Sequence, residues 1–166
     1  MKKSHNRKLV LFLAAVGLSA TVLAETKSTE GAAKPVHGKY IDWRLLGVSH
    51  REDKKTLRAI LGNDTAIEAA RNDQTKPWPD GSILAKVVWK ESTHPNWPQA
   101  IVPGEFASAE AMVKDGVKYA STGGWGFGHW QAGQLVMHEE AKAKECFACH
   151  APMKHNDYVY TFSVLK

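Results

Sequence analysis

Alternating apolar and polar residues predict short β-strands in several parts of the chain. The clearest strand is expected over residues 82–90, where every second side chain from Ile83 to Trp89 is apolar and faces the same side. A shorter strand is expected over residues 56–61, and another over residues 125–130, where large side chains alternate with glycine. The tail, residues 158–165, also has a strand-like composition.

Two segments are expected to form helices. Asp64 can cap a helix that runs to about Arg71, and residues 138–144 consist of strong helix formers. Short strands therefore outnumber helices, and no regular alternation of strand and helix is present. We predict an α+β fold, mainly an antiparallel β-sheet with a few short helices.

The segments between these elements are less determined. Residues 77–81 contain an Asp-Gly pair typical of a turn, and three prolines between residues 95 and 103 indicate a loop. Residues 38–48 and 107–119 fit either a helix or a strand.

Residues 1–24 have the pattern of a secretory signal peptide. Four basic residues precede an apolar run over residues 9–23, and cleavage is expected after Ala24. A run of about 15 residues is shorter than the roughly 20 that a spanning helix needs, so an uncleaved anchor is the weaker alternative. We expect a periplasmic protein with a flexible leader over residues 25–37 and one domain over residues 38–166.

The net charge comes mostly from this N-terminal segment. The chain has 22 basic and 17 acidic residues, a formal net charge of +5. Four of the basic residues and none of the acidic ones lie in the first 24 residues, which leaves +1 for the rest. Nucleic-acid binding depends on clustered Lys and Arg, so we expect no nucleic-acid partner.

Both cysteines of the chain lie in one motif, Cys146-Phe147-Ala148-Cys149-His150 near the C-terminus. This CxxCH pattern is typical of haem c attachment, because two thiols one helical turn apart can bond the two vinyl groups of one porphyrin. The adjacent imidazole can then reach the iron. We therefore expect one covalent haem c per chain, attached through Cys146 and Cys149, with His150 as the metal ligand.

Three other roles for the cysteines are weaker. A disulfide between them would close a very small loop and stabilise the protein little. A thioredoxin-like thiol pair is expected near an early strand, not close to the C-terminus. Zinc would need a further ligand such as His138 or His155, and would have to use the neighbouring Cys149 and His150 together.

The ligand on the far side of the iron separates two classes of haem protein. An electron-transfer cytochrome fills that position with Met or His. Met153 lies three residues after His150 and should stay on the side of that histidine. The upstream candidates are Met112, Met137, His129 and His138. Nothing in their spacing favours any one of them, so we expect an open distal site.

Further motifs surround the CxxCH pattern in a specific order. They are DGSILAK at 80–86, MVKD at 112–115, GWGF at 124–127 and VYT at 159–161. In this order the sequence resembles the cytochrome P-460 family, which includes the gas-binding proteins called cytochrome c′-beta, over roughly residues 40–165. The resemblance implies a mainly antiparallel β fold, a homodimer, one haem c per chain and a five-coordinate iron open to small ligands.

The resemblance also implies roles for two upstream residues. In hydroxylamine-oxidising members a lysine is joined covalently to the porphyrin edge, and it matches Lys86 here. A lysine buried on the partly apolar face of its strand can be a neutral, nucleophilic amine, whereas an ordinary strand lysine extends into solvent. A pocket arginine of the family matches Arg58, which could hydrogen-bond bound NO or O₂; the alternative is an exposed strand residue.

Aromatic residues could line an apolar pocket, although they more often fill a core. The candidates are Phe106, Trp125, Phe127 and Trp130. Among them we expect Phe127 to contact the haem.

One position departs from the family pattern. Catalytic members need a pocket carboxylate shortly before the first cysteine, as a proton acceptor. Counting back without gaps places Ala141 there, with Glu139 and Glu140 just upstream. On a helix Glu140 would point about 100° away from Ala141, so it does not replace the missing base automatically. The departure weakens an enzyme function and favours gas binding.

We therefore predict a periplasmic mono-haem c-type cytochrome that binds NO or a similar small diatomic ligand at an open iron site. The first alternative is a hydroxylamine-oxidising oxidoreductase with a lysine–haem cross-link, in which Lys86 and Arg58 act in catalysis. The second is an electron-transfer cytochrome with Met112 or Met137 as the distal ligand. The partners we consider are a small diatomic gas or hydroxylamine, a redox partner cytochrome and a second copy of the chain.

Overall fold

The structure is a computed structural model that describes residues 38–165. The expected signal peptide (1–24), with its cleavage point after Ala24, and the expected leader (25–37) lie outside the described residues. No helix within residues 38–165 is both long enough and apolar enough to cross a membrane.

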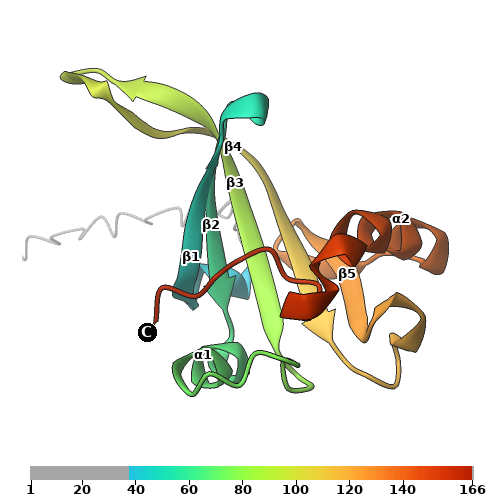
Figure 1. Ribbon diagram of the computed structural model, residues 1–166. Helices are drawn as coiled ribbons and strands as arrows, with labels where there is room; N and C mark the ends of the chain where they lie inside the picture. The colour runs from blue at the N-terminus through green and yellow to red at the C-terminus, as the bar shows by residue number, and fades with distance from the viewer. Residues whose placement is uncertain (1–37, 166) are drawn as a thin grey trace, which may run out of the picture. The chain divides into compact units, whose positions relative to one another are not determined.

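Six antiparallel strands form one sheet in which neighbours in sequence are neighbours in space (Figure 1). They are β1 (Arg44–Arg51), β2 (Thr56–Gly62), β3 (Ile83–His94), β4 (Trp97–Lys114), β5 (Trp125–Gln131) and β6 (Gln134–Met137). Two α-helices and four short 3-10 turns complete the described part of the chain. The predicted α+β class with a mainly antiparallel sheet is confirmed.

Both α-helices lie close to their predicted positions. Helix α1 (Asp64–Arg71) follows β2 and lies at one end of the sheet, and α2 (Glu140–His150) lies beside β5 (Figure 1). The prediction that Asp64 caps α1 is wrong by one residue. Asn63 is the N-cap, because its Oδ1 accepts a hydrogen bond of 3.1 Å from the amide of Ala66.

The expected loop over residues 95–103 is also wrong. Strands β3 and β4 continue through this region as a long hairpin that extends beyond the neighbouring strands (Figure 1). Strand β4 pairs with β5 only from Glu110 onward, so the outer part of β4 has an unpaired edge. An unpaired edge tolerates proline, because the missing N–H costs no ladder hydrogen bond there.

The remaining differences concern short segments. The open region 38–48 contains η1 (Lys39–Asp42) and the start of β1, and the open region 107–119 belongs to β4 as far as Lys114. Strand β6 was not predicted. The tail after residue 158 forms no strand; it runs along β1, where the amide of Val164 donates to the carbonyl of Leu46 at 2.8 Å.

The two faces of the sheet bury different clusters, as the alternation in β3 predicts. Leu84 belongs to the larger cluster, which includes residues of α1, α2 and the segment after α2. Ala85 and Val87 belong to the smaller one on the opposite face, with Tyr40 and Ala109. The larger cluster fills only one end of its face, and a cavity occupies the rest.

Candidate functional site

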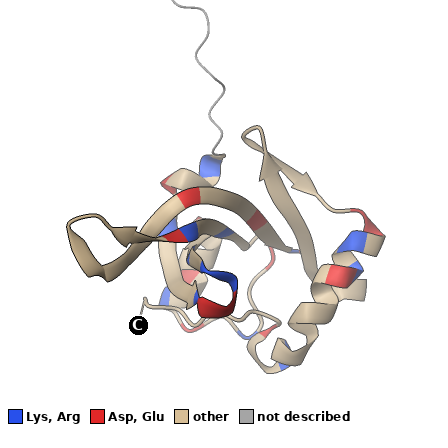
Figure 2. Cartoon of the chain, turned by 90° about the horizontal axis from the view of Figure 1, so that it is seen from above, with Lys and Arg blue, Asp and Glu red and all other residues tan. Residues whose placement is uncertain are grey.

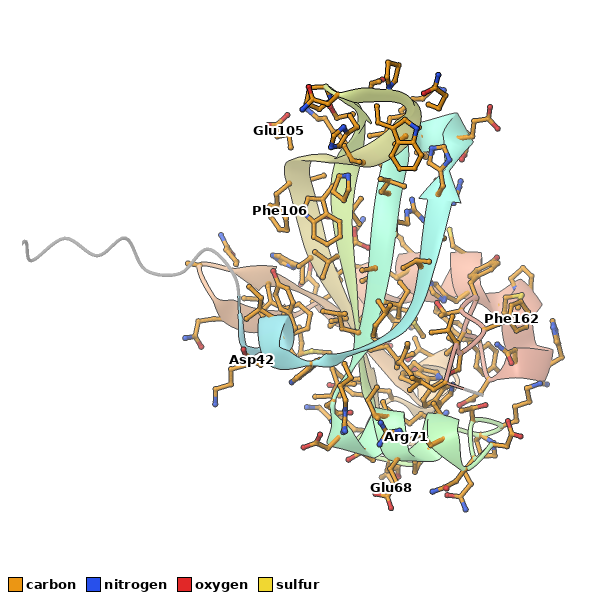
Figure 3. All side chains as sticks on the ribbon, turned by 90° about the vertical axis from the view of Figure 1, so that its left-hand side faces the viewer. Asp42, Glu68, Arg71, Glu105, Phe106 and Phe162 are labelled. Atoms are coloured by element: carbon orange, nitrogen blue, oxygen red, sulfur yellow. The ribbon has the colours of Figure 1, made fainter. Side chains whose placement is uncertain are left out.

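A cavity of about 1090 Å³ lies between the face of the sheet that carries Leu84, helix α2 and the C-terminal segment. This volume is at the upper end of the range for sites that hold small molecules and cofactors, ~300–1000 Å³. The C-terminal segment contributes Tyr160 and Phe162 to its wall, and Figure 3 shows Phe162 on that segment. The site predicted from the sequence lies around this cavity.

Helix α2 contributes Cys146, Cys149 and His150 to one wall of the cavity. Both thiols are free, and burial raises the pKa of the Cys146 thiol, which keeps it protonated. The spacing of three residues places both sulfurs on the same side of the helix, about one turn apart. Two free thiols and an adjacent imidazole on one cavity wall fit the donor set of a covalently attached haem.

The imidazole of His150 is held in one tautomer. Its Nδ1 lies 2.8 Å from the backbone carbonyl oxygen of Tyr158. A carbonyl can only accept, so Nδ1 carries the proton and donates, and Nε2 keeps the lone pair that a metal requires. Burial lowers the pKa of His150, although its bond to Tyr158 opposes this effect. The ring is therefore neutral, as a metal ligand must be.

The strand register arranges the cavity side chains in rows across the sheet, because paired residues of antiparallel strands share a face. The row nearest α2 contains Leu84, Met112 and Phe127. Phe127 is buried, lines the cavity and packs against His150, with the ring centroids 5.3 Å apart. This row therefore lies on the side of the expected metal ligand.

The next row, about 7 Å further along the strands, contains Lys86, Glu110 and His129. Nζ of Lys86 lies 2.5 Å from Oε2 of Glu110. Lys86 thus lines the cavity as expected, but as a cation paired with a carboxylate and not as a lone amine on an apolar face. The side chains remain 34% and 46% exposed, so the ion pair is accessible from the cavity.

Glu110 is ionised in this setting. Burial alone would raise the pKa of its carboxyl group, but the hydrogen bond and charge of Lys86 outweigh burial and lower the pKa below its ordinary value. A hydrogen bond of 3.1 Å from Ser108 and the charge of Arg58 act in the same direction. The cavity therefore contains an ionised carboxylate.

Arg58 occupies the third row, two rows away from Phe127. It lines the cavity, and its Nε is one of four buried side-chain polar atoms within residues 38–165 that have no hydrogen-bond partner. Burial lowers the pKa of Arg58 and the nearby Arg51 adds to this, but a guanidinium remains charged. Arg58 as a whole is only partly buried, and this unused buried donor can bind a polar ligand in the cavity.

Two histidines form another part of the wall. The rings of His129 and His138 stack with centroids 5.1 Å apart and an angle of 23° between their planes. Burial lowers the pKa of His138, and the adjacent His129 and Lys142 add to the effect. Nδ1 of His129 is buried without a hydrogen-bond partner, which is a second unused polar atom at the cavity.

The two candidate distal methionines lie in different places: Met112 lines the cavity and Met137 does not. Met112 lies in the row that also contains Phe127, on the side of His150. Met137 is not among the residues that line the cavity; its side chain approaches Gly126 and Gly128 on the other face of the sheet. Neither methionine is well placed to approach from the side opposite His150.

The sequence placed Ala141 at the family's carboxylate position and left open whether another carboxylate replaces it; the structure places one, Glu110, in the cavity. Ala141 is exposed and is not among the residues that line the cavity, and Glu140 pairs with Lys144 on the surface of α2. The cavity carboxylate is Glu110, which comes from β4. Alternation along 107–119 could have placed it on the face of Lys86 if that segment had been assigned as a strand.

The zinc alternative needs several protein ligands in one place. Within residues 38–165, the structure groups no three His, Cys, Asp or Glu side chains so that they could hold a metal ion.

Comparison with known proteins identifies a family. Residues 38–161 match the model of the family described as cytochrome P460. The match covers the whole sheet, both helices and the CxxCH motif. A search of curated proteins found no match.

Proposed function

The chain belongs to the cytochrome P460 family, which makes it a haem-binding cytochrome, and we propose that it carries one covalent haem c open to NO or a similar diatomic ligand. The observation that carries this proposal is the placement of Cys146, Cys149 and His150 together on one wall of a large cavity. A bound haem would supply an iron that can take a nitrogen ligand from His150 and a small diatomic molecule.

The protein side of this chemistry lies in α2 and the segment after it. The two thiols would form the thioether bonds, and His150 would provide the neutral Nε2 that its bond to Tyr158 leaves free. Phe127 packs against the imidazole and limits its rotation.

The side chains in the rows across the sheet support an open distal position on the iron. The row two steps from Phe127 holds Arg58 and not a Met or His, and the sulfur candidate Met112 lies on the side of His150. His129 and His138 lie in the cavity wall but stack on each other. Arg58 offers a hydrogen-bond donor that a bound diatomic can accept.

Haem attachment is tested by mass and by substitution. Intact mass should equal the chain from Glu25 onward plus one haem, and the haem should stay with the polypeptide after denaturation. The double variant Cys146→Ala/Cys149→Ala should lose this denaturation-resistant haem stain. A retained stain in the double variant, or a mass without haem in the parent, would overturn covalent attachment.

A hydroxylamine-oxidising activity is the second candidate, and Glu110 is the observation that favours it. An ionised carboxylate in the cavity can accept protons from a substrate as it is oxidised. The test is hydroxylamine turnover with an artificial electron acceptor, compared between the parent and Glu110→Gln. A 10-fold or larger fall in turnover in the variant would support this function. If the parent protein does not turn over hydroxylamine, this function is wrong.

Export to the periplasm, assembly as a homodimer and exchange of electrons with a partner cytochrome belong to the same proposal. Export is supported by the signal-like pattern of residues 1–24, and the dimer by the family resemblance. The periplasmic fraction of a native host should contain the haem protein, and its mass in solution should be twice that of the chain.

A further inference from the structure

The carbonyl that binds His150 belongs to an unusual stretch of backbone. Asp157 and Tyr158 are consecutive and both have positive φ, 47° and 65°. Asp visits this left-handed region fairly readily, but for a bulky aromatic residue it is a rare conformation. Such a conformation persists where the surrounding structure holds it in place, and it is common at functional sites.

Asp157 is fixed from three directions. Its carboxylate oxygens lie 2.9 and 2.8 Å from Nζ of Lys114, and one of them also accepts a hydrogen bond of 2.9 Å from the amide of Trp78. Its backbone carbonyl accepts a hydrogen bond of 2.8 Å from the indole Nε1 of Trp125. The residue before Tyr158 is therefore tied to the end of β4, the start of β5 and the segment before β3.

Lys114 is unusual in its own right. It is only 6% exposed, and among residues 38–165 it is the one Lys, Arg, Asp or Glu classed as fully buried. Nζ also approaches the carbonyl of Gly123 at 3.3 Å and lies 5.0 Å from the ring centroid of Trp125. A buried ion pair is often no more stabilising than apolar residues of the same size, so stability alone does not account for it.

The pair also lies outside the lining of the cavity, which includes neither Lys114 nor Asp157. Their connection to the site runs through one peptide unit, from the fixed Asp157 to the Tyr158 carbonyl and then to Nδ1 of His150. The ring of Tyr158 is held as well, because it packs against Phe147 and fills the space beside Gly123.

We propose that Lys114 and Asp157 are positioning residues that hold the Tyr158 carbonyl against His150 and so set how strongly this histidine donates electrons to the haem iron. The inference rests on the proposed role of His150 as the iron ligand. A stronger hydrogen bond from Nδ1 makes the imidazole more basic and favours the ferric state. A weaker bond does the opposite.

The test measures the iron–histidine bond of the ferrous holoprotein. In Lys114→Met and in Asp157→Asn, the iron–histidine stretching frequency in the resonance Raman spectrum should move to lower values, and the reduction potential should rise. Lys114→Arg should restore both towards the parent, because it returns the cation. Lys90→Met removes an exposed cation that pairs with Glu105 and should change neither quantity.

Two results would overturn the proposal. One is a Lys114→Met holoprotein with a lower melting temperature but an unchanged frequency and potential, which would make the pair purely structural. If Lys114→Met does not fold, the frequency and the potential are measured in the nearly isosteric Asp157→Asn, where unchanged values would also overturn the proposal. A parent spectrum without an iron–histidine band that shifts on ¹⁵N-histidine labelling would instead refute His150 as the ligand, which is a failure of the proposed function.

Discussion

At the residue scale, the ion pair between Lys86 and Glu110 decides what the lysine can do. Nζ of Lys86 lies 2.5 Å from Oε2 of Glu110, so the amine is already engaged by a partner on the sheet. The same carboxylate holds Nζ in a fixed place on the sheet. The pair therefore favours a lysine that lies near the haem without being bonded to it.

Peptide mapping tests this prediction. The tryptic peptide that ends at Lys86 should be recovered unmodified and in full yield from the holoprotein. Loss of that peptide, with recovery of a haem-bound fragment that contains Lys86, would contradict the prediction and support the cross-linked alternative. The peptide that ends at Lys90 is the internal control.

We expect substitution of Arg58 to change the dissociation rate of the ligand more than the stability of the fold. A hydrogen bond from a charged group contributes about 1.5–3 kcal/mol, so Arg58→Ala should speed NO dissociation by about 10-fold or more. Stopped-flow measurement of the off-rate checks this, with Arg44→Ala as the control because Arg44 pairs with Asp64 at the surface. An unchanged off-rate would remove Arg58 from the binding site.

Glu110 should also contribute to acid sensitivity. Because its pKa is lowered in the folded protein, ionised Glu110 contributes stability above its ordinary pKa of 4.5, and this contribution is lost as the pH falls through the lowered value. The melting temperature of Glu110→Gln should therefore fall less steeply than that of the parent below about pH 4.5. Lys86→Met should show the same flattening, and parallel curves for all three proteins would argue against the coupling.

Sequence patterns identify site residues when the chemistry is local. The CxxCH motif predicts roles for Cys146, Cys149 and His150 from their spacing along one helix alone, and the structure places all three at the cavity. Glu110 and the Tyr158 carbonyl were missed, because each acts through a partner far away in the sequence. Glu110 lies beside Lys86 because of the register of β4 against β3. The Tyr158 carbonyl belongs to a stretch with two consecutive positive φ angles, which the sequence does not reveal.

At the scale of elements, strands with clean alternation were predictable and hairpin details were not. Residues 82–90 form most of β3, as predicted. The prolines of β4 suggested a loop because the sequence does not reveal that this part of the strand has a free edge. Strand β6 was missed because its tight turn uses Ala132 and Gly133, both with positive φ, where Asn-Gly is the usual signal.

We expect helix α2 to be stabilised by the haem attached to it. Only Ala143 of its residues is fully buried, its N-cap Glu139 makes no side-chain capping bond, and isolated helices shorter than ~12–15 residues are marginal in water. In the Cys146→Ala/Cys149→Ala apoprotein, amides of α2 should therefore exchange with deuterium faster than in the holoprotein. Amides of β3 serve as the control and should be unchanged; equal protection of α2 in both proteins would contradict this view.

At the scale of the whole molecule, the sheet provides one wall of the cavity with Arg58, Lys86 and Glu110, and α2 provides the CxxCH motif. Rows of side chains across β2 to β5 order the cavity from Phe127 beside His150 to Arg58 on the third row. Helix α2 carries both basic and acidic residues (Figure 2), which form two ion pairs, Lys142 with Glu145 and Lys144 with Glu140.

An open iron site is tested most directly by the optical and resonance Raman spectra of the reduced protein before and after addition of NO or CO. We predict a high-spin, five-coordinate ferrous haem whose spectrum changes when either gas binds. A low-spin, six-coordinate spectrum that does not change when either gas is added would contradict this prediction.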